Sequence, residues 1–153
     1  MKKFLIAVCV FIATGNAIAQ KSTFVLDNEK IFNANDLSRI DSLLRKYHEN
    51  TGNHFGIVST DTFDIPPEEF VNRFAKQYLP GTTTTKFGLI LLLSRKNQLV
   101  HLTANDALKP FVNAEKLTEI ILTGKTALEE KRTAEGIIEI CRKGMEFMDK
   151  VGK

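Results

Sequence analysis

The stretch FGLILLLS, residues 87–94, is the most apolar part of the chain outside its N-terminal segment. Only Gly88 interrupts the apolar run, and no 3.6-residue periodicity passes through it. The run is much shorter than the roughly 20 residues that span a bilayer. A short, continuously apolar run is typical of a β-strand that is covered on both faces. Each buried leucine or isoleucine contributes roughly 1.5 to 3 kcal/mol of gross burial energy, so we expect this strand at the centre of the core.

The sequence around this strand predicts alternating helices and strands. Apolar residues at offsets of three and four predict amphipathic helices, whereas short β-branched runs between polar clusters predict strands. We expect strands at residues 22–26, 54–60, 87–94 and 98–103, and helices at residues 35–50, 67–79, 113–128 and 133–151. Gly124 and the charged residues 129–132 mark breaks in the C-terminal helical region. The core strand should have one parallel neighbour and one antiparallel hairpin partner. The fold class is therefore α/β, a three-layer α/β/α sandwich with a small mixed sheet.

Polar and glycine residues mark the ends of these helices. Asn33 or Asn35 is suited to cap the first helix, and Gly52 follows its end. Asn113 and Thr133 are expected to cap the two C-terminal helices. The four threonines at 82–85 predict a solvated loop before the core strand.

The N-terminal segment has the features of a secretory signal peptide. Lys2 and Lys3 precede an apolar stretch, and the sequence Ala-Ile-Ala at 17–19 is an A-x-A cleavage site. We expect residues 1–19 to be removed, which leaves residues 20–153 as a single exported domain in the periplasm or outside the cell. That mature segment contains no second apolar run long enough to span a membrane.

Charge and cysteine content exclude several kinds of function. The formal net charge is +3, and Lys2 and Lys3 contribute two of these charges. The remaining basic residues are spread through the helices, so nucleic acid is not an expected partner. Cys141 is the one cysteine left after Cys9 departs with the leader, and it falls on the apolar face of the last helix. It should be a buried, unreactive thiol without a disulfide.

No motif for catalysis or metal binding stands out. The chain has no G-x-S-x-G, no G-x-x-x-x-G-K-[ST] and no H-E-x-x-H sequence. Aspartyl-phosphate enzymes need a nucleophilic and an acid/base aspartate two residues apart, whereas Asp61 and Asp64 are three residues apart. Asp64 is better explained as a helix-start residue. The three histidines, His48, His54 and His101, have no ligand spacing. Catalytic residues therefore stay unknown, and whether the protein is an enzyme stays open.

One end of the predicted hairpin gathers polar residues. Pairing of 87–94 with 98–103 brings Lys86 next to Asn105 and Asp106, and we expect Asp27 to reach the same rim. Asp27, Asn105 and Asp106 would offer hard oxygen ligands of the kind that calcium or magnesium takes. The alternative is that these residues only form turns.

The order of elements resembles the TPM domain, a family of bacterial envelope proteins that also includes a protein of the photosynthetic lumen. The matching pieces are Val-Leu-Asp at 25–27, residues 47–52, residues 70–75 and, above all, Gly-Leu-Ile-Leu-Leu-Leu-Ser at 88–94 with the hairpin to 101–103. The resemblance covers nearly all of the mature chain and implies the α/β/α sandwich. It also implies phosphatase activity and divalent-cation binding near the rim in some members.

Two lysines depart from the pattern of that family. Its Asp-Asn-Gly before the core strand is Lys-Phe-Gly at 86–88 here, and a later acidic position becomes Lys109. Ammonium groups would repel a divalent cation or take its place by pairing with Asp27 or Asp106, and they could hold an anion. The candidate ligand-binding residues, in chain order, are Lys86, Thr103, Asn105, Asp106 and Lys109.

Two functional hypotheses follow. The first is a non-catalytic envelope module that binds an envelope protein or a small anion at this rim. The second is a weak acid phosphatase that uses calcium or magnesium held by Asp27, Asn105 and Asp106. A third reading, a scaffold without a ligand, has no residue in its specific favour.

Overall fold

The structure is a computed structural model, and it describes residues 24–62, 65–78 and 86–153. Side chains are described throughout these ranges except at residues 74–78. The expected signal peptide, Asp64 and the threonine run at 82–85 lie outside the described residues. The predictions for these segments stay predictions.

The centre of the fold is a four-stranded mixed sheet in the order β1-β2-β3-β4. The strands are β1 (Val25–Asp27), β2 (His54–Ser59), β3 (Gly88–Ser94) and β4 (Leu99–Ala104). The first three strands are parallel, and β4 pairs with β3 as an antiparallel hairpin. Every residue of β3 is buried. The predicted central strand and both of its neighbours are therefore confirmed.

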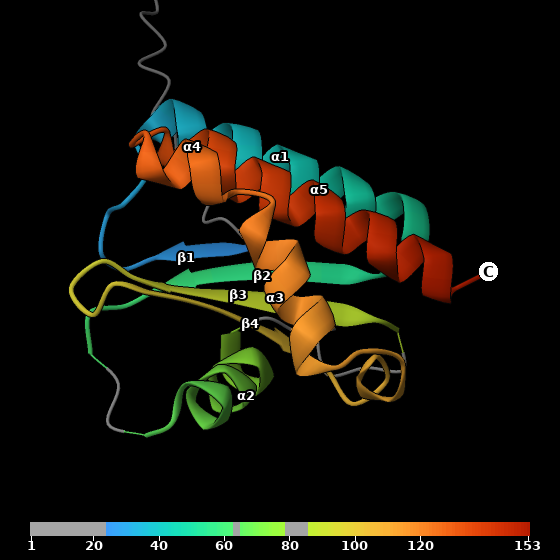
Figure 1. Cartoon of the computed structure of the whole chain (residues 1–153). Helices are drawn as coiled ribbons and strands as arrows, with labels where there is room; N and C mark the ends of the chain where they lie inside the picture. Colours follow the sequence, from blue (N-terminus) through green and yellow to red (C-terminus); the bar gives the residue numbers. More distant parts are fainter. Residues whose placement is uncertain (1–23, 63–64, 79–85) are drawn as a thin grey trace, which may run out of the picture.

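Helices cover both faces of the sheet (Figure 1). On one face lie α1 (Ala34–Thr51), α4 (Lys125–Glu129) and α5 (Thr133–Val151), and on the other lies α2 (Pro67–Tyr78). The helix α3 (Ala114–Leu122) contacts both β4 and α5. A short 3₁₀ turn, η1 (Lys109–Phe111), leads into it, and no sequence pattern predicted that turn. The three-layer α/β/α sandwich is confirmed.

Capping residues explain most of the helix boundaries. The side chain of Asn33 accepts a hydrogen bond from Asp36 N–H at 2.9 Å, and Asn113 does the same for Lys116 at the start of α3. Gly52 ends α1 in the left-handed region at φ 71°, a conformation that glycine adopts at little cost. The prediction that Thr133 caps the last helix is wrong. Thr133 is the first helical residue, and Arg132 before it makes no side-chain cap.

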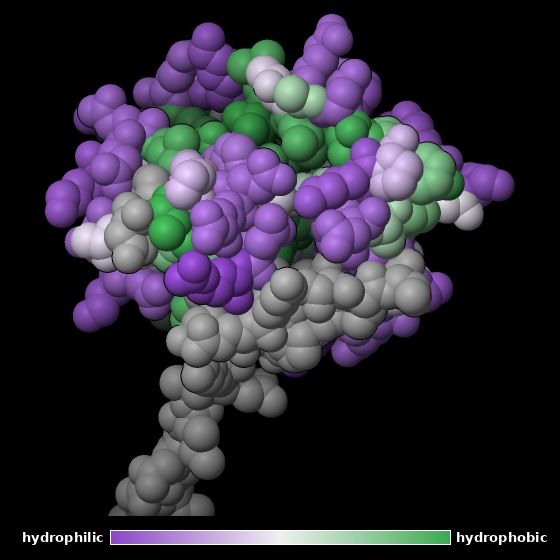
Figure 2. Space-filling model, turned by 90° about the horizontal axis from the view of Figure 1, so that it is seen from below, coloured by the Kyte–Doolittle hydropathy of each residue, from purple (hydrophilic) through white to green (hydrophobic). Residues whose placement is uncertain are grey.

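Two apolar clusters lie on the two sides of the sheet. The larger one fills the space between the sheet and α1 and α5, and it contains Phe55, Leu89 and Leu91. The smaller one, on the α2 side, is built on Val58, Val71, Ile90 and Leu92. The view from that side shows apolar surface exposed between polar residues (Figure 2). Within the described ranges, no helix combines the length and apolar character that crossing a membrane requires.

Candidate functional site

The hairpin register brings the predicted rim residues together at the start of β3. Leu89 pairs with Ala104, so Lys86 and Asn105 lie side by side just beyond the paired strands. The Asn105 amide donates to the Lys86 carbonyl at 2.7 Å, and its oxygen accepts from Gly88 N–H and Leu108 N–H, both at 3.1 Å. Asn105 thus fastens the loop after β4 to the start of β3.

The second lysine at the rim, Lys109, forms ion pairs with two carboxylates. Lys109 Nζ lies 3.2 Å from Asp106 Oδ1 and 3.8 Å from Glu68 Oε1, which belongs to α2. The Asp106 side chain is 99% exposed, so these pairs are solvated and contribute little to stability. The expectation that a lysine pairs with Asp106 is met by Lys109, and the two carboxylates offset the charge of this lysine.

Lys86 lies on the other side of the rim, against a small cavity. The cavity has a volume of about 370 Å³ and lies between the end of α1, the start of β3 and the end of α5. Its polar lining comes from Thr51, Asn53, Lys86 and Asp149. A Cβ atom at Gly52 would lie 3.2 Å from Lys86 Cε, so the lysine stem runs directly over that glycine. The turn at Gly52 therefore positions Lys86 at the cavity wall.

The half-buried Tyr47 fixes the polar groups of this cavity. Tyr47 donates to Asp149 Oδ1 at 2.9 Å, lies 3.2 Å from the Met145 carbonyl, and accepts from Asn53 Nδ2 at 3.2 Å. Burial, the largest cause, raises the pKa of Tyr47 to about 12, so its hydroxyl keeps its proton at any physiological pH. Thr51 accepts from Asn53 N–H at 3.1 Å. The cavity wall is therefore a connected hydrogen-bond network.

Thr103 does not line this cavity. It pairs with Ile90 and so faces the α2 side of the sheet, where Ile90 belongs to the smaller apolar cluster. It is 6% exposed, and its hydroxyl has no hydrogen-bond partner in the described structure.

Asp27 lies at the opposite end of the sheet from Lys86, so the expectation that it reaches the rim is wrong. β1 is parallel to β2 and β3, and Asp27 pairs with Ser59, which in turn pairs with Leu93 near the end of β3. Lys86 precedes β3, whereas Asp27 ends β1. The Asp27 carboxylate serves the main chain there: it accepts from Ile31 N–H and Phe32 N–H at 2.9 Å and from the Ser59 hydroxyl at 2.5 Å.

The rim residues do not fit a divalent cation. Calcium and magnesium take several oxygen ligands at once, preferably carboxylates. Here Asp27 is remote, the Asn105 oxygen already accepts two N–H groups, and Lys86 and Lys109 bring positive charge. In the part of the chain that the structure describes, no three or more histidine, cysteine or acidic residues are arranged to hold a metal ion.

Two of the three histidines, His48 and His54, are in contact. Their spacing in the sequence did not predict this contact. The rings of His48 and His54 are 3.8 Å apart between centroids, and Phe24 lies within 6 Å of both. Burial and then the neighbouring His48 lower the pKa of His54, whose Nδ1 has no partner among the described residues. The left-handed turn at Gly52 reverses the chain between the two histidines, and that glycine was the signal for the contact.

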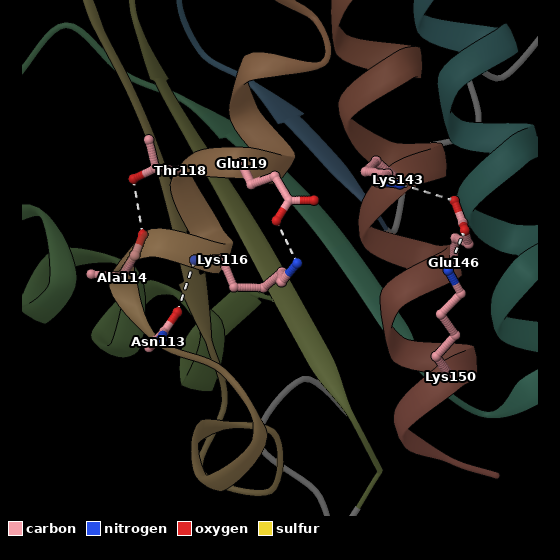
Figure 3. Close-up of polar contacts among 8 residues, drawn as sticks. All are labelled: Asn113, Ala114, Lys116, Thr118, Glu119, Lys143, Glu146 and Lys150. Carbon is pink, nitrogen blue, oxygen red and sulfur yellow. Dashed lines mark hydrogen bonds and ion pairs between the residues drawn. The ribbon is translucent and has the colours of Figure 1, made fainter.

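Further charged residues line α3 and α5 near the rim (Figure 3). Lys116 pairs with Glu119 on α3, and Glu146 on α5 accepts from Lys150 at 2.6 Å and lies 3.4 Å from Lys143. Lys116, followed by Lys143 and Lys150, lowers the pKa of Glu119. On both helices these lysines are therefore paired with carboxylates.

Comparison with known proteins agrees with this fold. The model of the TPM domain matches residues 25–146, so the chain belongs to the TPM domain family. None of the curated proteins compared with the sequence is a match.

Three solved structures show the same fold at low sequence identity. The N-terminal domain of a P. gingivalis protein has a TM-score of 0.67 and 20% identity, and the match covers 87% of this chain and 86% of that one. The BA42 protein of Bizionia argentinensis has a TM-score of 0.68 and 11% identity, with 80% and 85% covered. The N-terminal domain of cg2496 from Corynebacterium glutamicum has a TM-score of 0.60 and 14% identity, with 88% and 84% covered.

Proposed function

We propose that this TPM domain is a non-catalytic binding module of the cell envelope, which holds an anionic group at the rim beside Lys86. The anionic group belongs either to a small molecule such as phosphate or to an acidic side chain of an envelope protein. The observation that carries the proposal is the position of Lys86. Its side chain lines a cavity of about 370 Å³ at the rim, where the TPM pattern would place a carboxylate.

The neighbours of Lys86 support an anion more than a cation. Thr51 and Asn53 bring a hydroxyl and an amide to the same cavity, and Asp149 is the one carboxylate among its lining residues. Asp149 already accepts the hydrogen bond from Tyr47, which partly satisfies its charge. The Thr51 hydroxyl donates its proton to the Tyr47 carbonyl at 2.8 Å, so the ammonium of Lys86 and the side-chain amide of Asn53 are the donors that would hold a phosphate or carboxylate.

The phosphatase alternative lacks a supporting observation. It requires Asp27, Asn105 and Asp106 to hold one cation, and the sheet places Asp27 at the other end. Hydrolysis of phosphate monoesters that depends on calcium or magnesium and is abolished by Asp106→Ala would nevertheless establish it and would overturn the binding proposal.

The two rim lysines provide a matched test. Inorganic phosphate is titrated into ¹⁵N-labelled protein, and amide shifts are followed by NMR spectroscopy. We expect saturable shifts around residues 51–53 and 86–88, and at least tenfold weaker binding for Lys86→Gln. Lys109→Gln should bind as the unaltered protein does, because Lys109 is already paired with Asp106 and Glu68. Shifts that are unaffected by Lys86→Gln would contradict the proposal.

A further inference from the structure

The edge strand β4 offers the longer edge of the sheet. The other edge strand, β1, has only three residues, whereas β4 has six. In an antiparallel pair, residues alternate between bonding the partner strand and pointing away from it. Asn105 N–H donates to the Gly88 carbonyl at 3.0 Å, and this bond sets the alternation along β4. The main-chain N–H and C=O groups of Val100 and Leu102 therefore point away from β3.

Only the first half of this edge is accessible. Leu99, Val100 and His101 are half-buried, whereas the three residues from Leu102 onward are buried. α3 contacts β4, and Figure 1 shows it crossing well away from the hairpin turn. No hydrogen bond joins the outward main-chain groups of Val100 to any residue that the structure describes.

An apolar groove runs beside the accessible half of β4. Its volume is about 1000 Å³, with Leu99 and Val100 on one wall and Ile121, Leu122 and Leu128 on the other. Leu122 is 54% exposed, and it is one of two large apolar side chains exposed to this degree among the described residues. Unpaired main-chain polar groups beside exposed apolar side chains suit an extended peptide, which offers both hydrogen bonds and alternating side chains.

The accessible half of β4 lacks three features that commonly prevent strand addition. Exposed edge strands are commonly protected by lysine, by proline or by a bulge. The residues from Leu99 to His101 include no lysine and no proline, and β4 pairs with β3 in unbroken register. The accessible half of β4 is thus a ready template for another strand.

Charge at the groove indicates what kind of peptide fits. Arg95 and Lys125 both line the groove, and Glu129, the carboxylate that lines it with them, lies 3.7 Å from the Lys125 ammonium. The Arg95 guanidinium donates to the Lys30 carbonyl at 3.5 Å, and the Glu29 carboxylate accepts the Arg95 main-chain N–H at 2.9 Å. The positive charge of Arg95 at the groove still favours an acidic residue on the bound segment.

We propose that the groove and the open edge of β4 bind an extended segment of a partner protein as an added strand. The segment carries apolar side chains at alternate positions, and these enter the groove toward Leu122 and Leu128. An acidic residue beside them faces Arg95. This site lies at the hairpin end of the sheet, opposite to the rim at Lys86, and it does not depend on the anion site.

A second copy of this chain is a poorer occupant of the edge. Stable interfaces bury about 800 Å² on each partner, and pairing through three residues of each β4 falls far short of that. A second copy would also bring its own α3 and α4 against the same groove. A separate flexible segment brings no helices of its own, and its side chains can fill the groove in addition to pairing with β4.

The test uses a fluorescein-labelled synthetic peptide, Asp-Asp-Val-Ser-Val-Ser-Val-Ser-Val, and the purified full chain, with fluorescence anisotropy as the readout. We expect saturable binding. Two further peptides carry N-methyl groups on the amides of the valines or of the serines, because alternate amides lie on opposite edges of a strand. One of the two should bind at least tenfold more weakly than the parent peptide, and the other should bind like it.

Variants of the protein locate the contact. Val100→Pro removes an N–H that points away from β3, so it should spare the sheet and weaken binding at least tenfold. Leu122→Glu should also weaken binding at least tenfold, and it leaves β4 unaltered. Phe111→Glu is the matched control, since Phe111 is 55% exposed at the other end of the sheet, and it should leave binding unchanged.

Three results of the peptide-binding assay would overturn the proposal. They are the absence of saturable binding, equal binding of both N-methylated peptides, and binding that survives Leu122→Glu. A dimer of the full chain that sedimentation shows to dissociate with Val100→Pro would assign the edge to a second copy, and this too would overturn it.

Discussion

Asp27 has a carboxylate that could bind a metal ion, but in this fold it accepts hydrogen bonds from the main chain. It accepts two backbone N–H groups and one hydroxyl, and these bonds hold the turn between β1 and α1. Asp106, by contrast, projects into solvent with one ion pair. From the sequence the two residues are equivalent candidates for a cation site, and only the direction of the strands separates them.

This difference predicts that the two residues contribute unequally to stability. Asp27→Ala should lower the free energy of unfolding by about 1.5 to 3 kcal/mol, because hydrogen bonds to a charged group are lost and two N–H groups lose their partner. Asp106→Ala should change it by less than about 0.5 kcal/mol, as is usual for a solvated surface residue. Urea denaturation of both variants measures the two values, and a large loss for Asp106→Ala would contradict this account.

The histidine pair predicts that stability depends on pH. The pKa of His54 is lowered by burial and by His48, so the folded protein binds its proton more weakly than the unfolded chain does, whose ordinary value is 6.5. Stability is therefore fully present above that value, and it falls as the pH drops from 6.5 toward the lowered pKa of the folded state.

Melting temperatures measured from pH 7.5 to pH 5 test this dependence. His54→Phe, an apolar ring suited to the contact with Phe24, should flatten the profile in this window. His101→Phe is the control, because His101 lies on β4, away from the pair, and its variant should keep the slope. A profile that is unchanged by His54→Phe would assign the dependence to other groups.

At the scale of elements, α5 can pack closely against the sheet because residue 144 is a glycine and has no side chain. A Cβ atom at Gly144 would lie 2.6 Å from Phe55 Cε2 and 2.9 Å from Leu89 Cδ1, both in the main cluster. Real side chains do not approach so closely, so an added methyl group must displace the helix or both neighbours.

Gly144→Ala should therefore lower the free energy of unfolding by about 1 to 3 kcal/mol, despite the better helix propensity of alanine. Gly152→Ala is the matched control, since a Cβ atom there meets nothing nearer than 3.5 Å. Thermal or chemical denaturation of the two variants compares them. An equal or higher stability for Gly144→Ala would show that α5 does not lie as close to the sheet as described.

The elements themselves were largely predictable, because their signals are local. Continuous apolar character identified β3, and periodicity with Asn33 and Gly52 identified α1 and its ends. The start of α5 was less predictable, since Thr133 has the chemistry of a cap but lies one residue inside the helix. Where several polar residues lie near a helix start, propensity alone does not show which of them is the cap.

At the scale of the whole molecule, the rim could be predicted only in part. The hairpin register was enough to bring Lys86 to Asn105 and Asp106. The position of Asp27, the burial of Thr103 and the contact of His48 with His54 depend on strand direction and on the path of the chain at Gly52. Such long-range relations leave little trace in the local sequence, which is why the predicted cation set was not assembled.

The central claim is that the rim holds an anion and not a divalent cation. Its most direct test is the melting temperature of the purified protein with chelator, with calcium, with magnesium and with inorganic phosphate, because a ligand that binds only the folded state raises that temperature. We predict a rise that increases with phosphate concentration, is absent in Lys86→Gln, and is the same with or without chelator. A rise produced by calcium or magnesium and reversed by chelator would contradict the claim.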